Sequence, residues 1–202
     1  MAYKAFAPDL SCTVGDNRFQ YYPGRWNEEP EANCAKNGFH CAENPLDCLT
    51  YYPDWNRAVY YLVLADGDIN EDGRDSKISC TRMKLVKRLD LREFVAHSLR
   101  YLYEHPYMKN PYHIRNEYGE ATRGFVIVRG KKPMAKGKQG DILGFAREYP
   151  ESEKIQEIGL YIVDGADILA DTWYDVEGNG TDKKGAAHEK ETTEENACGS
   201  AK

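Results

Sequence analysis

Long apolar runs are missing from this chain. The longest, Ala58–Ala65, falls far short of the roughly 20 residues that a membrane-spanning helix needs. The first residues, Met1–Phe6, also lack the apolar segment of a secretory signal peptide. We therefore expect no membrane association and a location in the cytoplasm.

A surplus of basic residues is missing as well. The 202 residues include 27 Lys and Arg against 33 Asp and Glu, so the formal net charge is -6. Binding to a nucleic-acid backbone depends on basic side chains, and this balance predicts no direct nucleic-acid binding. An acidic surface can meet a basic protein partner, although a charge of this size is also typical of an ordinary soluble domain.

Zinc-binding patterns are lacking too. The six cysteines include no Cys-x-x-Cys pair. Without a secretory signal, we expect reduced and mostly buried thiols rather than disulfides. His40 and Cys41 are adjacent, so in a strand they would point to opposite sides and make a poor zinc site.

A calcium pattern is present only in part. Asp68, Asn70 and Asp72 alternate as in the first half of a calcium loop, but the twelfth position holds Ser79 instead of a glutamate. Asp-Gly pairs form hairpin turns readily, so the sequence predicts a turn over residues 66–73. We predict no metal ion and no cofactor.

The most structured pattern lies between Asn37 and Pro53. Residues 38–41 are typical of a strand end. Asn44 and Pro45 then indicate a helix start, because an Asn side chain caps free backbone N–H groups and proline suits the first helical position. The pair Tyr51-Tyr52 closes this helix, and the following proline ends it. The pattern predicts a strand, a turn and a short helix.

A second, longer helix is predicted after residue 89. The segment Asp90-Leu-Arg-Glu93 is a capping box, and the helix is expected to run to about His105. Five apolar residues at helical spacing predict the side that faces the core: Leu91, Phe94, Val95, Leu99 and Leu102.

Most of the remaining pattern is strand-like. Alternating or apolar runs predict strands near residues 3–6, 19–22, 58–65, 78–86 and 124–130, and a small antiparallel sheet over 141–146, 155–163 and 171–176. The predicted class is α+β, with a twisted, mainly antiparallel sheet and two helices. We expect a main domain over 1–120, a small β unit over 121–177 and a disordered tail over 178–202.

Two groups of motifs resemble one family. Gly38-Phe-His-Cys-Ala-Glu-Asn-Pro-Leu-Asp47 with Tyr51-Tyr-Pro53 resembles the amino-terminal domain of uncharacterised phage and prophage proteins, and Ala170-Asp-Thr-Trp-Tyr174 resembles their carboxy-terminal cap. In many of those proteins a repeat array that looks like a β-solenoid separates the two ends. Here the array is absent, and residues 124–140 are a candidate remnant. The resemblance implies phage or prophage origin without naming an activity.

The candidate ligand-binding residues are His40, Asn44, Tyr51 and Tyr52, and the catalytic residues remain unassigned. His40 is interpreted either as a core histidine bonded to backbone groups or as part of a pocket. Our first hypothesis is a non-enzymatic protein that binds a host protein or protein complex, for example as an inhibitor of host defence.

The second hypothesis is an ADP-ribosyltransferase-like domain, active or degenerate, that binds a small nucleotide. A glycine-aromatic strand end followed by a short helix with aromatic residues is similar to the frame of the nicotinamide pocket in those enzymes. They also need a glutamate near the end of the domain, and the sequence singles out none. The third hypothesis is a structural phage component.

Overall fold

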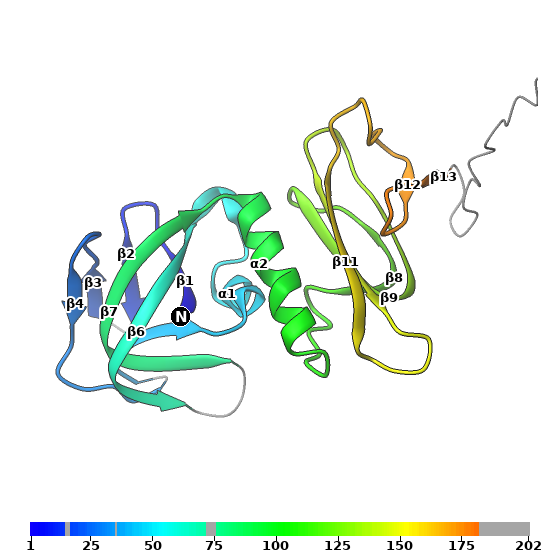
Figure 1. Ribbon diagram of the computed structural model, residues 1–202. Coiled ribbons are helices and arrows are strands. Elements are labelled where there is room, and N and C mark those ends of the chain that lie inside the picture. Colours follow the sequence, from blue (N-terminus) through cyan, green and yellow to red (C-terminus); the bar gives the residue numbers. More distant parts are fainter. Residues whose placement is uncertain (15–16, 35, 72–75, 182–202) are drawn as a thin grey trace, which may run out of the picture.

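The protein is described by a computed structural model that places residues 1–14, 17–34, 36–71 and 76–181. Two β-sheets lie on either side of one central helix, α2 (Leu91–Glu104), as Figure 1 shows. The predicted α+β class, with antiparallel sheet structure and two α-helices, is confirmed. Among the residues placed, no helix combines the length and the apolar content needed to cross a bilayer.

The first sheet closes on itself. Its strand order is β4-β7-β5-β1-β6, and β6 also pairs with β7, so β1, β5, β6 and β7 form a ring of antiparallel pairings. The five strands are β1 (Ala2–Phe6), β4 (Trp26–Glu28), β5 (Phe39–Ala42), β6 (Val59–Glu71) and β7 (Lys77–Leu89). A separate hairpin consists of β2 (Ser11–Val14) and β3 (Asn17–Gln20).

Successive side chains of β1 point alternately into this ring and away from it. Ala2 and Phe6 belong to the core inside the ring, and Lys4 lies on the same face with its ammonium group 5.4 Å from the centre of the Phe6 ring. Tyr3 and Ala5 point the other way, toward the core shared with α2. A lysine is therefore directed into a largely apolar interior.

The short helix after β5 begins as the sequence predicts. A 3-10 turn, η1 (Pro45–Asp47), leads directly into α1 (Cys48–Tyr51), and a further turn, η2 (Trp55–Arg57), follows. Oδ1 of Asn44 accepts a hydrogen bond from the Leu46 backbone N–H at 3.1 Å, which satisfies one of the free donors at the start of the turn.

Helix α2 also has the predicted capping box. The Asp90 carboxylate accepts from the Glu93 backbone N–H at 2.8 Å, and the Glu93 carboxylate accepts from the Asp90 N–H at 3.2 Å. The predicted apolar stripe is confirmed, because Phe94, Val95, Leu99 and Leu102 are buried and Leu91 is partly buried. The stripe contacts both sheets: its core includes Leu46 and Tyr60 on one side and Ile127 and Ile142 on the other.

The second sheet has six strands. They are β8 (Arg115–Glu120), β9 (Phe125–Lys136), β10 (Ile142–Glu148), β11 (Ile155–Ile162), β12 (Trp173–Tyr174) and β13 (Gly180–Thr181). The pairs β10–β11, β9–β12 and β12–β13 are antiparallel.

The antiparallel pairing expected between residues 141–146 and 155–163 is present as β10–β11, but the sheet is mixed, because β9 pairs in parallel with both β8 and β10. Arg115 lies beside Val128, Glu120 beside Lys136 and Phe125 beside Ile142, so residues 13 to 17 positions apart are neighbours. The three consecutive strands β8, β9 and β10 thus run side by side in the same direction, as in the coils of a parallel β-solenoid. Strand β8 also places the start of this sheet before residue 121.

Two further boundaries differ from the expectations. The turn expected over residues 66–73 is not found at residues 66–71, because β6 continues to Glu71 with a bulge between Asp66 and Ile69 and stays paired with β7. Residues 72 and 73 lie outside the described residues. Residues 180 and 181, which are expected to belong to the tail, form β13 and pair with β12. The rest of that tail, 182–202, lies outside the described residues.

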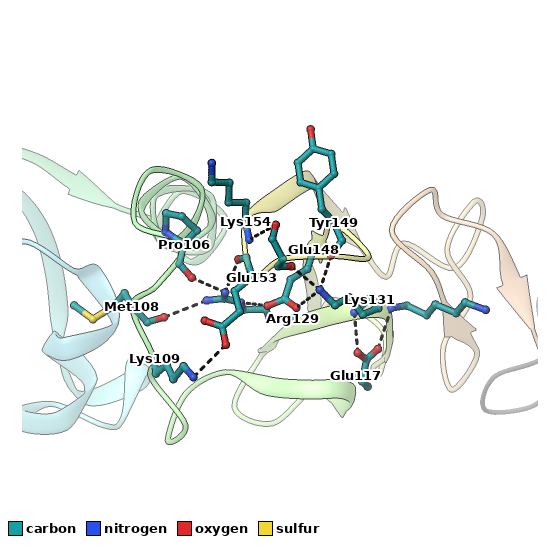
Figure 2. A network of polar contacts seen from close by, with 12 residues as sticks. Pro106, Met108, Lys109, Glu117, Arg129, Lys131, Glu148, Tyr149, Glu153 and Lys154 are labelled. Atoms are coloured by element: carbon teal, nitrogen blue, oxygen red, sulfur yellow. Dashed lines mark hydrogen bonds and ion pairs between the residues drawn. The ribbon is translucent and has the colours of Figure 1, made fainter.

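Arg129 on β9 ties the loop after α2 to the second sheet (Figure 2). Its guanidinium group donates to the carbonyl oxygens of Pro106, Met108 and Glu153, and it pairs with the Glu148 carboxylate at 2.7 Å. The side chains of Arg129 and Glu148 are only 12% and 14% exposed, so this ion pair is shielded from solvent. The loop after α2 is thereby held at a defined position.

Candidate ligand-binding pocket

A seam opens in the first sheet between β1 and β5. The two strands share a single register pair, Tyr3 with Ala42, whereas β1 pairs with β6 along its whole length. The backbone carbonyl of His40 accepts its hydrogen bond from the Lys4 ammonium group at 2.5 Å. A lysine side chain therefore bridges the two strands where they separate.

A cavity of about 400 Å³ lies at this seam. Its walls come from β1, β2, β5, the η1–α1 segment and the start of β7. The volume falls within the range of about 300–1,000 Å³ that is usual for small-molecule sites. Elements distant in the sequence thus converge on one concave surface.

Three of the four candidate binding residues line this cavity: His40, Tyr51 and Tyr52. Asn44 does not, because its buried side chain caps η1 and its backbone N–H donates to Ser76 Oγ at 2.8 Å. The structure therefore places Asn44 as a support of the adjacent turn, and places the other three residues at one site.

Asp47 is the acidic residue in the cavity wall, and its carboxylate is fully occupied by the protein. Oδ2 accepts from the hydroxyl and the backbone N–H of Ser76, at 2.7 and 3.2 Å. Oδ1 accepts from the amide groups of Asn44 and Asn110, at 3.3 and 3.1 Å. Asp47 therefore fastens η1 to the start of β7 and to the loop after α2, and its charge is compensated within the wall.

The floor of the cavity carries a buried cation. Lys4 is 7% exposed, and its ammonium group faces the rings of Phe6 and Tyr21 at 5.4 and 5.2 Å. Burial by itself lowers the pKa of Lys4, but Tyr21 and the thiols of Cys12 and Cys41 oppose it, and the pKa ends above its ordinary value. Lys4 is therefore charged at neutral pH.

The rim of the cavity carries a second cation. The Lys77 ammonium group donates to the Tyr51 hydroxyl at 2.9 Å and lies 5.2 Å from the centre of that ring. Tyr51 is 54% exposed, in contrast to Lys4, so the cavity runs from a solvent-facing tyrosine to a buried lysine.

Two thiols of the wall, those of Cys41 and Cys48, remain protonated at neutral pH. Burial raises the pKa of Cys48 to about 12, and a hydrogen bond with Cys80 together with burial raises the pKa of Cys41 well above its ordinary value. Cys12 accepts a hydrogen bond from the Tyr52 hydroxyl at 3.4 Å. The five described cysteines form no disulfide, as predicted, and Cys198 lies outside the described residues.

The described ranges contain no group of three or more His, Cys, Asp or Glu side chains arranged to hold a metal ion. The cavity wall instead combines aromatic rings, two ammonium groups, thiols and one compensated carboxylate. Such a wall suits the binding of a small molecule that contains both a ring and a negative charge.

Sequence reasoning missed Lys4 and Lys77. A signal for Lys4 exists, because it alternates with Ala2 and Phe6 in the first strand and therefore shares their inward face. No comparable local signal marks Lys77, whose position depends on the pairing of Lys77 with Ala42 across β5 and β7.

A family comparison covers the part of the chain that contains the cavity. A DUF7666 domain, described as a domain of unknown function, spans residues 1–97. All residues that line the cavity, from Tyr3 to Lys77, lie within it. No curated protein and no solved structure matches the chain. The cavity is thus a feature of the DUF7666 region, whereas the second sheet lies outside the match.

Proposed function

We propose that residues 1–97 form a small-molecule-binding domain that takes a nucleotide-like ligand into the cavity at the β1–β5 seam. The observation that carries the proposal is the convergence of His40, Tyr51 and Tyr52 on one open cavity whose walls also hold Lys4 and Lys77. Aromatic rings offer stacking surfaces to a base, and ammonium groups attract phosphate oxygens.

Binding without catalysis fits this wall better than a transferase reaction. An ADP-ribosyltransferase needs a carboxylate that is available to orient the ribose, whereas Asp47, the acidic residue of the cavity wall, already accepts four hydrogen bonds. The high pKa values of Cys41 and Cys48 also disfavour a thiolate nucleophile there. We therefore place the domain among ligand-binding modules.

The biological setting that we propose follows from the resemblance of the two end motifs to phage and prophage proteins. In this setting the protein is encoded by a phage or prophage and acts in the cytoplasm of the host cell. The ligand would then be a host or phage metabolite that the domain senses or sequesters.

A second candidate function, the binding of a host protein, is favoured by exposed tyrosines beyond the first sheet. Tyr107 and Tyr149 are 66% and 47% exposed, and each is adjacent in sequence to a residue that Arg129 holds, Pro106 and Glu148. Tyrosine is enriched at protein interfaces because one side chain supplies both apolar area and a hydrogen bond.

The two candidates call for different experiments. For the host-protein candidate, the wild-type chain and a Tyr107→Ser/Tyr149→Ser variant would be used to capture partners from host lysate. A stoichiometric partner that is lost with the double variant, but kept by Tyr22→Ser elsewhere on the surface, supports this function. Absence of such a partner contradicts it. Recovery of the chain in purified virions would indicate the structural role instead.

For the pocket, thermal unfolding would be measured with NAD, ADP and adenosine. A ligand at ten times its Kd should stabilise the folded protein by about 1.4 kcal/mol. We expect this shift in the wild type, a reduced shift in His40→Ala, and an undiminished shift in His105→Ala, whose exposed side chain lies outside the cavity. No shift with any of the three compounds would contradict the proposed function.

A further inference from the structure

Lys4 is a buried cation without an anionic partner among the described residues. None of the ion pairs that these residues form includes it. Moving an ammonium group from water into a protein interior costs on the order of several kcal/mol unless nearby charges or hydrogen bonds compensate. Buried lysines are therefore usually paired, and this one is an exception that calls for a physical reason.

The contacts of Lys4 satisfy part of its hydrogen-bonding capacity. An ammonium group has three N–H donors. The His40 carbonyl oxygen accepts from one, and the Tyr21 hydroxyl interacts with another. Both partners are neutral, and the faces of Phe6 and Tyr21 add attraction for the cation. The protein thus supports the positive charge at this point without supplying a negative one.

The position of this charge relative to the cavity is the second observation. Lys4 lines the cavity, and a second ammonium group, that of Lys77, lies at its rim. The chain as a whole has a net charge of -6, so the cavity is a local positive site on an acidic protein. A negatively charged small molecule is attracted to such a site and repelled by most of the remaining surface.

We propose that the Lys4 ammonium group is the counter-charge for an oxyanion of the ligand, a phosphate or a carboxylate, which enters the seam between β1 and β5. The inference rests on the proposed function and specifies it: the anionic end binds at the floor, and the ring of the ligand lies at the rim beside Tyr51. Lys4 is then the residue that selects charged over uncharged ligands.

The test compares charged and uncharged probes by isothermal titration calorimetry. The probes are ADP, adenosine, inorganic pyrophosphate and succinate. In the wild type we expect ADP to bind at least tenfold more tightly than adenosine, since a hydrogen bond to a charged group contributes about 1.5–3 kcal/mol and 1.4 kcal/mol corresponds to tenfold. Pyrophosphate and succinate separate a phosphate site from a carboxylate site.

The deciding variant is Lys4→Met, which replaces the ammonium group by an apolar side chain of similar length. We expect this variant to fold with a lower melting temperature, because it loses the hydrogen bond to the His40 carbonyl oxygen and the contacts of the ammonium group with the rings of Phe6 and Tyr21. ADP and adenosine should bind to this variant with equal affinity. Lys132→Met, an exposed lysine of the second sheet, is the matched control and should keep the preference for ADP.

The outcomes separate this inference from the proposed function. Equal binding of ADP and adenosine to the wild type would overturn the role of Lys4 and leave the nucleotide-like ligand in place. Binding of pyrophosphate or succinate alone, lost in Lys4→Met, would support the anion site and contradict the nucleotide-like ligand. Failure of all four probes to bind the wild type would overturn both. If Lys4→Met does not fold, Lys77→Met takes its place: a kept preference for ADP supports Lys4 as the selecting charge, and a lost preference overturns it.

Discussion

The hydroxyl group of Tyr3 on β1 lies 3.0 Å from Nδ1 of His97 on α2, and the two rings meet edge to face with their centres 5.5 Å apart. Tyr3 precedes Lys4, so this contact helps to hold the strand that carries the buried cation against the central helix. The first sheet and α2 are therefore held together by this contact, and the titration of His97 is linked to the stability of the protein.

The stability of the protein should fall as the pH drops below about 6.5. Burial lowers the pKa of His97 and also that of His113. The unfolded chain, with ordinary histidine pKa values near 6.5, then binds more protons than the folded protein, so the free energy of unfolding decreases as the pH falls through this range. Urea denaturation at pH 7.5, 6.5 and 5.5 measures the effect. In His97→Gln the decrease should be smaller, and an unchanged decrease would refute the role of His97.

Replacing Asp47 by alanine should lower the free energy of unfolding by about 3 kcal/mol, because several buried donors would lose their acceptor together. Those donors belong to Asn44, Ser76 and Asn110. Urea denaturation of Asp47→Ala would be compared with Asp167→Ala, an exposed acid in the loop between β11 and β12. Equal stability of the two variants would mean that the carboxylate does not fasten the turn.

Replacing Arg129 by methionine should destabilise the protein by about 2 kcal/mol, since the shielded Glu148 carboxylate would lose its nearest cationic partner and keep only Lys131, 3.4 Å away. The loop after α2 would also lose the donor to Pro106 and Met108, so limited proteolysis should cut there first. Arg115→Met, at an exposed position of β8, is the control. Proteolysis with the same pattern and rate in both variants would contradict this assignment.

Local features of the fold could be predicted from the sequence because their causes are local. The capping box of Asp90 and Glu93 and the cap formed by Asn44 each join residues two or three positions apart, and both are present. Side-chain chemistry at such short range depends little on the rest of the chain. The same holds for the apolar stripe of α2.

Pairings between distant strands could not be predicted in this way. The closure of the first sheet depends on β6 meeting both β1 and β7, and the parallel winding of the second depends on residues such as Arg115 and Val128 meeting across a bend. The alternation of apolar residues indicates that a segment is a strand, but it does not identify the strand with which that segment pairs. The parallel pairing of β9 with β8 and β10 could therefore not be predicted from the sequence.

The candidate site was predicted in part for the same reason. His40, Tyr51 and Tyr52 lie close together in the sequence, and they do line one cavity. Lys4 and Cys12 reach it from β1 and β2, through pairings that the sequence alone does not reveal. The charged floor of the cavity, on which the proposed selectivity depends, became visible only with the fold.

The most direct measurement is a titration of the isotope-labelled protein with ADP, followed residue by residue in ¹H–¹⁵N NMR spectra. The proposed site predicts saturable shifts that concentrate on the amides of β1, β5 and α1, including those of Lys4, His40 and Tyr51, with little change in the second sheet. Shifts centred on the loop around Tyr107, or no saturable shift at all, would contradict a nucleotide-like ligand at the β1–β5 seam.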